Sequence, residues 1–260
     1  MDIRWARAQT LPMRLQSLTA HRRSGDQLTD EEVRSLWQYR LRIFRLKPDI
    51  EPEQDWLWFR DLTRKSNDIW RFQNVEGQLV GFYQSRTLTR TIQGRAVSVF
   101  IADFAFIDRR FRGHPVTQLA LARTLAPILA ASLRRPTYAL AVPYPTTLTS
   151  ATRRGGRPIY DGEAVPGSLD AAVMDSFRLE LTGDETPGSI VSMNTIPETP
   201  SEIWQRRHVG DAALKEYEQR NPRWREGYCL FIGGRLDVAF HMQVALSVAQ
   251  RWMRKRQPVT

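Results

Sequence analysis

The stretch at residues 95–133, RAVSVFIADFAFIDRRFRGHPVTQLALARTLAPILAASL, decides how the rest of the chain can fold. It begins with the period-two pattern of a buried strand, continues through an arginine-rich turn that holds Gly113 and Pro115, and ends with leucines at helical spacing. A helix that begins directly after such a turn presents its free N–H groups and the positive end of its dipole to the turn. The stretch therefore predicts an anion site, of the kind that holds a phosphate, between a strand and a helix.

Composition predicts a globular protein with its own core. Of the 260 residues, 42% are apolar and eight are tryptophans, which is more apolar surface than a disordered chain carries. The single cysteine, Cys229, excludes an intramolecular disulfide and a cysteine-rich metal site, and it suits a reducing compartment. Its setting, YCLFI, is typical of a buried strand, so we expect an inert thiol.

The hydrophobic profile predicts neither a signal peptide nor a membrane segment. The first residues, MDIRWARAQTLPMRLQ, contain arginines throughout and have no continuous apolar run of ~7–15 residues. No other apolar run approaches the ~18–20 residues that a membrane span requires. We therefore expect a cytoplasmic protein.

The charge is strongly positive. A formal net charge of +10 and a pI near 10.3 fit a nucleic-acid surface, an anionic small ligand or an acidic protein partner. Only four of the 38 basic residues are lysines, a skew that a GC-rich genome produces without selection for binding. The basic groups are short and dispersed, and aromatic residues do not interleave with them as on a base-stacking platform. Nucleic-acid binding is therefore not favoured.

Hydrophobic spacing divides the chain into helices and strands. A capping box at Thr29 and Glu32 precedes helical spacing, and period-two runs separated by glycine turns then predict an antiparallel meander. The expected order is a helix at 29–46, a helix at 53–65, strands at 69–75, 78–92 and 95–107, a helix at 116–133, a strand at 135–143, a short helix at 144–156 and a strand at 157–161.

The remaining hundred residues give a weaker pattern. A segment at 168–181 precedes an expected helix at 203–220, a strand, turn and strand at 228–240, and a closing amphipathic helix at 242–256. The fold class is therefore α+β, with α/β/α layers: a mixed, mostly antiparallel central sheet with flanking helices. We expect residues 1–28 to form a loosely structured arm and residues 29–260 to form a single domain with a C-terminal extension.

This order of elements, between about residues 29 and 160, resembles the GCN5-related N-acetyltransferase (GNAT) superfamily. In that family a long strand leads into a turn and helix that hold the pyrophosphate of acetyl-CoA, with a hydrophobic residue, an aromatic residue and then R-G-x-G-x-G/A. Here Ile107, Phe111, Arg112 and Gly113 match this pattern. The resemblance implies a GNAT-like fold and a binding site for acetyl-CoA or another acyl-CoA.

The turn departs from the family pattern at two positions. Pro115 and Thr117 stand where the family has small residues, and the proline removes one N–H that would bind a phosphate oxygen. A register that begins at Arg110 fails at one position only, but it loses the match of aromatic, arginine and glycine. Guanidinium groups in the turn can supply charge in compensation. The donor-binding residues implied by the preferred register are Ile107, Arg110, Phe111, Arg112, Gly113, His114, Val116 and Thr117.

The family's usual catalytic acid is missing. The resemblance places Ala151 where many members have a tyrosine that protonates the departing thiolate. Tyr144, Ser150 or Tyr160 would then replace it, or water would. Tyr144 is the nearer of the two tyrosines in sequence, and we take it as the candidate acid.

Asp103 is the candidate general base. Alternation places it in an apolar row on the strand at 95–107, on one face with Val97, Ile101 and Ile107. A carboxylate on a buried face is expected to have a raised pKa and can accept a proton from an amine. The alternative is an ion pair with an arginine of the neighbouring strand, Arg86 or Arg90.

Other site chemistry finds no support. The sequence has no G-x-S-x-G, G-x-x-x-x-G-K-[ST] or H-E-x-x-H motif, and its four histidines, His21, His114, His208 and His241, are far apart. No metal site is expected. His114 lies in the turn, where it either contacts a ligand or is simply solvated.

The sequence thus predicts an N-acyltransferase that moves an acyl group from acyl-CoA to an amine. In one alternative the donor is an acyl carrier protein and the acceptor resembles an amino acid, because the resemblance extends to N-acyl amino acid and acyl-homoserine lactone synthases. In another, the chain is a non-catalytic GNAT-fold protein or a basic nucleic-acid-binding protein. The acceptor itself is not predicted.

Overall fold

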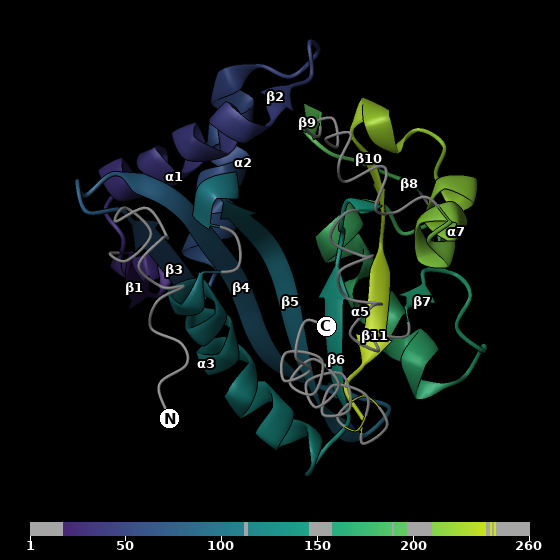
Figure 1. Ribbon diagram of the computed structural model, residues 1–260. Helices are drawn as coiled ribbons and strands as arrows, with labels where there is room; N and C mark the ends of the chain where they lie inside the picture. Colours follow the sequence, from purple (N-terminus) through teal and green to yellow (C-terminus); the bar gives the residue numbers. More distant parts are fainter. Residues whose placement is uncertain are drawn as a thin grey trace, which may run out of the picture. The chain divides into compact units, whose positions relative to one another are not determined.

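The structure is a computed structural model that describes residues 18–111, 114–145, 158–188, 190–196 and 210–237, together with residues 240 and 242 (Figure 1). Contacts divide the chain into two compact units. Unit 1 takes its described residues from Met1–Arg42, Pro52–Arg86 and Ala102–Pro127, and unit 2 takes the rest. Two long strands, β4 (Leu79–Ile92) and β5 (Arg95–Ile107), and helix α3 (Pro115–Ser132) contribute residues to both units.

Unit 1 contains an antiparallel sheet. Strand β1 (Thr19–Arg23) pairs with β3 (Asp68–Gln73), and β3 pairs with β4, with Asp68 opposite Ser85. The predicted strands at 69–75 and 78–92 are therefore confirmed. The arm expected at residues 1–28 ends in strand β1 and a 3-10 turn, η2 (Gly25–Gln27), and residues 1–17 lie outside the described residues.

The two long strands form a hairpin. The two residues between them, Gln93 and Gly94, have φ angles of 50° and 71°. Positive φ at both positions is the type I′ turn, whose twist matches that of antiparallel strands. The third predicted strand of the meander is therefore confirmed, and β4 and β5 run side by side in Figure 1.

Two helices lie between β1 and β3 in the chain: α1 (Asp30–Ile43) and α2 (Pro52–Arg64). The predicted capping box opens α1, because Thr29 N–H donates to the Glu32 carboxylate at 2.9 Å and Glu32 N–H donates to Thr29 Oγ1 at 3.2 Å. The helix ends three residues before the predicted end. Strand β2 (Arg45–Leu46) follows it, because these residues pair with β9 (Thr195–Ile196) instead.

Helices cover both faces of the sheet in unit 1. The ring of Phe82 contacts Tyr39 of α1 and Phe59 of α2, with centroid distances of 6.2 Å for both pairs. Trp70 lies on the opposite face, since it pairs with Tyr83, and its Nε1 donates to Thr124 of α3 at 2.9 Å. The expected α/β/α layering is therefore present within this unit.

Unit 2 contains the parallel part of the sheet. Strand β6 (Thr137–Ala141) runs parallel to β5, with Ser98 opposite Thr137 and Ile101 opposite Leu140. Parallel neighbours need a crossover, which α3 supplies. Strand β6 then pairs in antiparallel fashion with β11 (Ile232–Arg235), which also pairs with β7 (Ile159–Tyr160).

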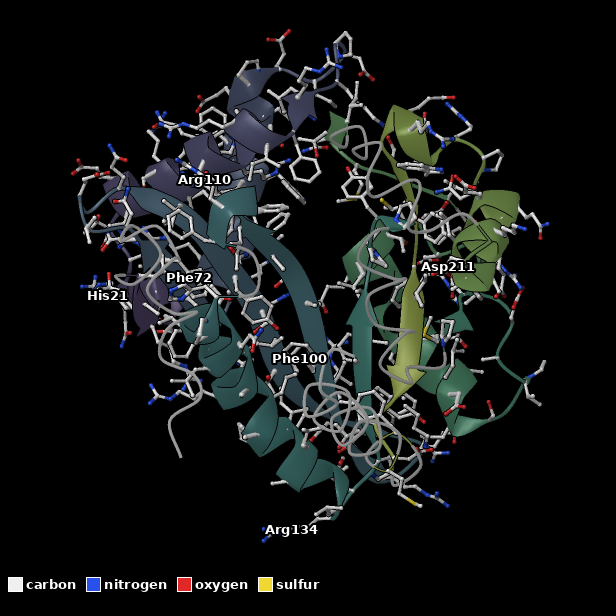
Figure 2. All side chains as sticks on the ribbon, viewed as in Figure 1. His21, Phe72, Phe100, Arg110, Arg134 and Asp211 are labelled. Carbon is white, nitrogen blue, oxygen red and sulfur yellow. The ribbon has the colours of Figure 1, made fainter. Side chains whose placement is uncertain are left out.

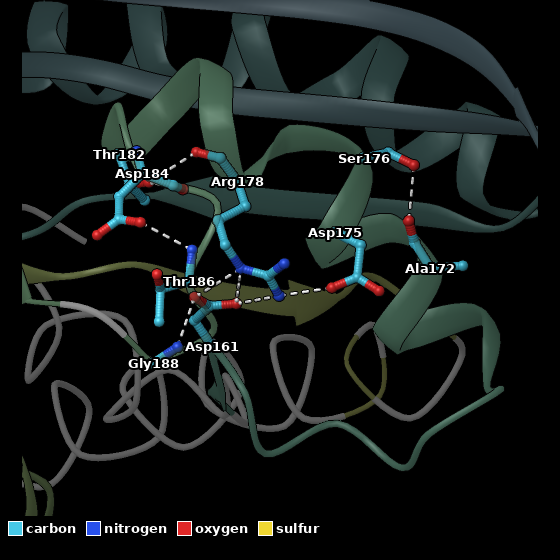
Figure 3. A network of polar contacts seen from close by, with 9 residues as sticks. All are labelled: Asp161, Ala172, Asp175, Ser176, Arg178, Thr182, Asp184, Thr186 and Gly188. Atoms are coloured by element: carbon cyan, nitrogen blue, oxygen red, sulfur yellow. Dashed lines mark hydrogen bonds and ion pairs between the residues drawn. The ribbon is translucent and has the colours of Figure 1, made fainter.

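The segment at 168–181, for which the sequence specifies no element, is a helix, α5 (Leu169–Thr182). Ser168 caps its start by accepting from Ala171 N–H, and Gly183 ends it with a φ of 74°. Figure 3 shows how α5 is held: Arg178 makes two-pronged contacts with the Asp161 carboxylate at 2.9–3.1 Å, and Gly188 N–H donates to the same carboxylate at 2.9 Å. Aromatic and aliphatic side chains of α5, including Phe177, lie in the core against β5 and β6.

The strand, turn and strand expected at 228–240 is wrong as a hairpin. Strand β10 (Tyr228–Leu230) pairs with β8 (Ile190–Ser192), whereas β11 joins β6, so the two strands lie in different sheets. Phe231 lies between the two strands in the chain and is 1% exposed. Before them lie α7 (Ala212–Arg220) and a 3-10 turn, η4 (Trp224–Glu226).

Three other predicted elements lie partly or wholly outside the described residues: the short helix at 144–156, the first half of the helix at 203–220 and the closing helix at 242–256. The described elements confirm the fold class, a mixed and mostly antiparallel sheet with flanking helices. Among the residues described, no helix has the length and apolar character for a membrane span.

The positive charge is unevenly distributed along the chain. Thirteen of the 38 basic residues, but only three of the 28 acidic residues, lie outside the described residues. The part that the structure describes therefore contains equal numbers of basic and acidic residues. The net charge of +10 is therefore carried by the residues outside the described ranges.

Candidate active site

The turn after β5 is organised by Asp108. Its N–H donates to the Val80 carbonyl at 2.9 Å, which ties the end of β5 to β4. Its carboxylate accepts from the N–H and from the guanidinium of Arg110, at 3.0 and 2.8 Å. The hydrogen bond to Asp108 raises the pKa of Arg110 above its usual value. Arg110, labelled in Figure 2, has a 71% exposed side chain, so its charge faces solvent beside the turn.

Phe111 anchors the turn in the core. It ends the 3-10 turn η3 (Arg109–Phe111) and is 5% exposed. Its N–H donates to the Asp108 carbonyl at 2.9 Å, and its carbonyl accepts from His114 N–H at 3.1 Å. A buried aromatic ring at this position fixes where the chain leaves the strand and enters the helix.

The first N–H groups of α3 are already engaged. Pro115 has none, Val116 N–H donates to Nδ1 of the His114 ring at 3.2 Å, and Thr117 N–H donates to the His114 carbonyl at 3.1 Å. His114 therefore acts as the cap of the helix, because its ring and its carbonyl accept these two N–H groups. A phosphate at this helix end would have to displace the ring or use other donors. Arg112 and Gly113, two of the predicted donor-binding residues, lie outside the described residues.

Asp103 is paired with Arg86, the alternative that the sequence left open. Arg86 Nε lies 3.1 Å from one carboxylate oxygen of Asp103, and its Nη2 lies 3.0 Å from the other. The two side chains are 4% and 3% exposed. The predicted apolar row is thus interrupted by a buried, two-pronged ion pair between neighbouring strands.

Strand β5 loses its regular alternation at Asp103. The rings of Phe104 and Phe106 lie 6.3 and 5.3 Å from the ring of Phe82, so both share its face of the sheet. Arg86, four residues from Phe82 along β4, is on that face by alternation. Because Asp103 reaches Arg86, two successive residues of β5 point to the same face. This is the signature of a β-bulge.

The bulge corrects the predicted face of Ile107. Alternation placed Ile107 on one face with Asp103, but the structure separates them. Ile107 packs against Gly81, where a Cβ atom would lie 3.1 Å from Ile107 Cγ1 and 2.6 Å from the Phe106 carbonyl oxygen. Gly81 neighbours Phe82 in the chain and therefore faces the other way. The glycine permits this close approach of β4 to the end of β5.

The main chain of β5 is open to solvent at the bulge. Asp103 as a whole is partly exposed although its side chain is buried, so the exposed area belongs to its peptide group. The parallel pairing with β6 spans Ser98–Ile101, and β5 then continues to Ile107. An open strand segment can bind an extended ligand through main-chain hydrogen bonds.

Tyr144, the candidate acid, belongs to unit 2, whereas Asp103 and the turn belong to unit 1. Its hydroxyl donates to the Thr195 carbonyl at 3.0 Å, and its ring stacks on Phe44 at 5.5 Å. These contacts tie Tyr144 to the β2–β9 ladder. Its proton is committed to a carbonyl, so a catalytic role requires that this bond open. Tyr160 is 6% exposed, and burial raises its pKa. Ser150 lies outside the described residues.

Sequence reasoning missed two groups of buried polar residues. Gln84 and Ser85 of β4 are both fully buried, and in the described part of the chain Gln84 Nε2 and Ser85 Oγ have no hydrogen-bond partner. Lys47, after β2, is also buried. A run of polar residues, QSR, inside an apolar strand was the available signal for the first group. The described residues contain no cluster of His, Cys, Asp and Glu suited to a metal ion.

No family model and no curated protein match this chain. Solved structures do match. A probable N-acyltransferase from Enterococcus faecalis V583 is 14% identical, with a TM-score of 0.39, over 55% of this chain and 33% of that chain. The aligned part thus spans a third of the length of that protein.

Two further structures illustrate the matches. NAA60 from Arabidopsis thaliana, solved with a bisubstrate analogue, is 11% identical with a TM-score of 0.38, over 58% of this chain and 93% of that chain. An acyl-CoA N-acyltransferase from Pseudomonas aeruginosa is 17% identical with a TM-score of 0.36, over 55% and 91%. Two of the three, those from Enterococcus faecalis and Pseudomonas aeruginosa, are named as N-acyltransferases.

Proposed function

We propose that this protein is an N-acyltransferase that moves an acyl group from acyl-CoA to an amine. The observation that carries the proposal is the opened main chain of β5 at Asp103, on a strand that runs straight into the Asp108–Phe111 turn and α3. An extended thioester arm can add to such a strand, and exposed N–H groups there can polarise its carbonyl. The donor's phosphates would then lie toward the turn and Arg110.

Within this proposal Asp103 accepts the amine proton and Tyr144 is the candidate acid. Arg86 has the role of holding the Asp103 carboxylate in place, since it binds both carboxylate oxygens. Ile107, Phe111, His114, Val116 and Thr117 shape the end of the donor site, together with Arg112 and Gly113. The acceptor is an amine, and cytoplasmic localisation is part of the same proposal.

The occupied N–H groups of α3 favour one second candidate. A donor without a nucleotide has no pyrophosphate to place at the helix end, and an acyl carrier protein is such a donor. The acyl group and the pantetheine arm are the same in both cases, so the β5 segment would be used in the same way. The two candidates differ only in what lies beyond the arm.

Thermal unfolding with CoA, acyl-CoA of several chain lengths and acyl carrier protein tests the proposal, because a ligand specific for the folded state raises its melting temperature. We expect acyl-CoA to raise it and to be consumed when a panel of amines is added. Arg112→Glu should abolish the shift, whereas Arg123→Glu, an exposed position farther along α3, should leave it intact. A shift with acyl carrier protein alone would select the second candidate. The proposal fails if no donor produces a shift or is consumed.

A further inference from the structure

Lys47 is a buried cation with uncharged partners. It follows β2 and is 8% exposed. Its ammonium donates to Ser192 Oγ at 2.9 Å and lies 4.1 Å from the centroid of the Tyr228 ring. The nearby thiol of Cys229 is uncharged as well, since burial raises its pKa to about 12. Asp49, two residues further on, is exposed, and within the described part of the chain no carboxylate forms an ion pair with Lys47.

The other buried cations show how unusual this is. The described residues contain four buried basic side chains. Three of them are arginines, and in each case two guanidinium nitrogens contact both oxygens of one carboxylate. The pairs are Arg40 with Asp55, Arg86 with Asp103, and Arg178 with Asp161. An ammonium taken out of water without a counter-ion costs several kcal/mol. Lys47 is therefore the one described buried cation whose counter-ion is not supplied by the described residues.

The fold holds Lys47 in place from several sides. Its N–H donates to the Asn194 carbonyl at 3.0 Å. Gly227 has a φ of 84°, and a Cβ atom there would lie 2.8 Å from Lys47 Cε and 2.4 Å from the Thr195 carbonyl oxygen. Because Gly227 has no Cβ atom, the Lys47 side chain can pass close to it and place its ammonium beside Ser192. Because Ser192 is exposed, a ligand from solvent can reach the pair.

We propose that Lys47 and Ser192 bind an oxyanion, a carboxylate or a phosphate, that is carried by the acyl acceptor. The ammonium has three N–H groups, of which one donates to Ser192, and the hydroxyl of Ser192 can turn its own hydrogen to the same anion. This inference rests on the proposed function, in which the acceptor is an amine. The amine and the anion would then belong to one molecule.

The position of the site in unit 2 supports this link. Leu46, the residue before Lys47, pairs with Thr195, whose carbonyl accepts from the Tyr144 hydroxyl. Phe44, which stacks on Tyr144, is three residues before Lys47, and three residues of extended chain span about 10 Å. An acceptor bound at Lys47 would thus lie on the same short ladder as the candidate acid.

Binding is tested first, without any acyl transfer. Thermal unfolding is followed in sodium acetate, sodium phosphate and sodium chloride at equal ionic strength, for the full chain and for Lys47→Met and Lys47→Arg. We expect acetate or phosphate to raise the melting temperature of the wild type, and Lys47→Arg to retain the effect. Lys47→Met should lose it and, without anion, should be at least as stable as the wild type, because it removes an uncompensated charge.

Two outcomes of this experiment would overturn the inference. One is equal melting temperatures of the wild type in all three salts. The other is a large loss of stability in Lys47→Met without anion, which would make Lys47 a structural cation. Whichever of acetate and phosphate acts at lower concentration identifies the oxyanion. If acetate and phosphate act only at molar concentrations, the bound anion is an adventitious additive only, and the inference is overturned.

Acyl transfer gives an independent readout. Matched amines, an amino acid and its amide, are compared as acceptors with a fixed acyl-CoA. We expect kcat/KM to favour the charged acceptor about tenfold or more in the wild type, as an ion-paired hydrogen bond would, and Lys47→Met to remove the preference through KM. Transfer to both amines with equal kcat/KM would overturn the anion site and leave the proposed function intact. Anion binding without transfer to any amine would overturn the proposed function and leave the anion site intact.

Discussion

Arg86 and Asp103 form a buried ion pair in which two guanidinium nitrogens reach both carboxylate oxygens, at 3.1 and 3.0 Å, across neighbouring strands β4 and β5. This contact coincides with the position at which β5 ceases to alternate. Arg86→Leu leaves a buried carboxylate without its counter-ion, and we expect the free energy of unfolding in urea to fall by about 3–5 kcal/mol. The double variant Arg86→Leu/Asp103→Leu should recover most of that loss. A double variant as unstable as the single one would show that the pair does not act as a unit.

The same pair is tested for catalysis by Asp103→Asn. This variant keeps the shape of the side chain but removes its charge, so donor binding should persist. If Asp103 accepts the amine proton, kcat should fall about 100-fold, the range typical of a general base. An unchanged kcat would show that Asp103 is not the general base and that its role is to stabilise the bulge through its ion pair with Arg86.

Much of unit 1 and of the β4–β5 hairpin was predictable because the signals are local. The capping box at Thr29, the alternation of β4 and β5 and the glycine turn at Gly94 each specify a structure within a few residues. Even the Arg86–Asp103 pair was an open alternative, since an acidic residue in an apolar row needs a partner from the next strand. The bulge was not predictable, because alternation carries no sign of one extra residue.

The features missed in unit 2 depend on distant partners. Strands β2 and β9 have two residues each, which is too short for a periodic pattern, and they form because segments 150 residues apart in the chain meet. Lys47 directly follows β2, and its neighbours in sequence include Arg45 and Asp49, which are typical of an exposed segment. Its burial depends on the pairing of β2 with β9 and could not be predicted from these neighbours. In unit 1 the cap formed by His114 was missed for a related reason: a histidine in a turn is usually solvated, and only the fold of the turn aims its ring at Val116.

His114→Ala tests whether the ring competes with the donor. The variant frees the Val116 N–H, so we expect CoA to bind a few-fold more tightly, as measured by calorimetry, while loss of the cap lowers the free energy of unfolding by about 1 kcal/mol. His114→Asn is the matched control, because asparagine is a good cap and should keep the stability. Weaker CoA binding in His114→Ala would instead show that the ring contacts the donor.

Tyr144→Phe tests the candidate acid. The stack on Phe44 is kept, and the hydrogen bond to the Thr195 carbonyl is lost. We expect the free energy of unfolding to fall by about 1 kcal/mol. A fall in kcat of about 100-fold at unchanged donor affinity would assign Tyr144 the acid role, and a kcat within a few-fold of the wild type would exclude it.

Cys229 predicts a specific loss of stability at alkaline pH. Burial raises the pKa of its thiol to about 12, whereas an unfolded chain gives a thiol pKa of about 8.5. Between these values the folded state keeps a proton that the unfolded state loses, so stability falls as pH rises above about 8.5. The effect should be visible in urea unfolding between pH 8 and 10 and should be absent in Cys229→Ala, apart from a constant cost of the lost packing. The thiol should also resist a thiol reagent until the protein unfolds, and rapid labelling of the folded protein would contradict its burial.

Gly81→Ala tests the close approach of β4 to the end of β5. The added Cβ would lie 2.6 Å from the Phe106 carbonyl oxygen and 3.0 Å from Ile107 Cα, and both are main-chain atoms that cannot rotate away. The strand end must move, at a cost of about 1–3 kcal/mol, and it should carry the Asp108 turn with it. Gly77→Ala is the control: it has open space around it but a φ of 74°, so it should cost about 1–2 kcal/mol through the backbone alone. We therefore expect similar losses of stability but a selective loss of acyl-CoA binding in Gly81→Ala. Equal acyl-CoA affinities in the two variants would show that the end of β5 does not take part in donor binding.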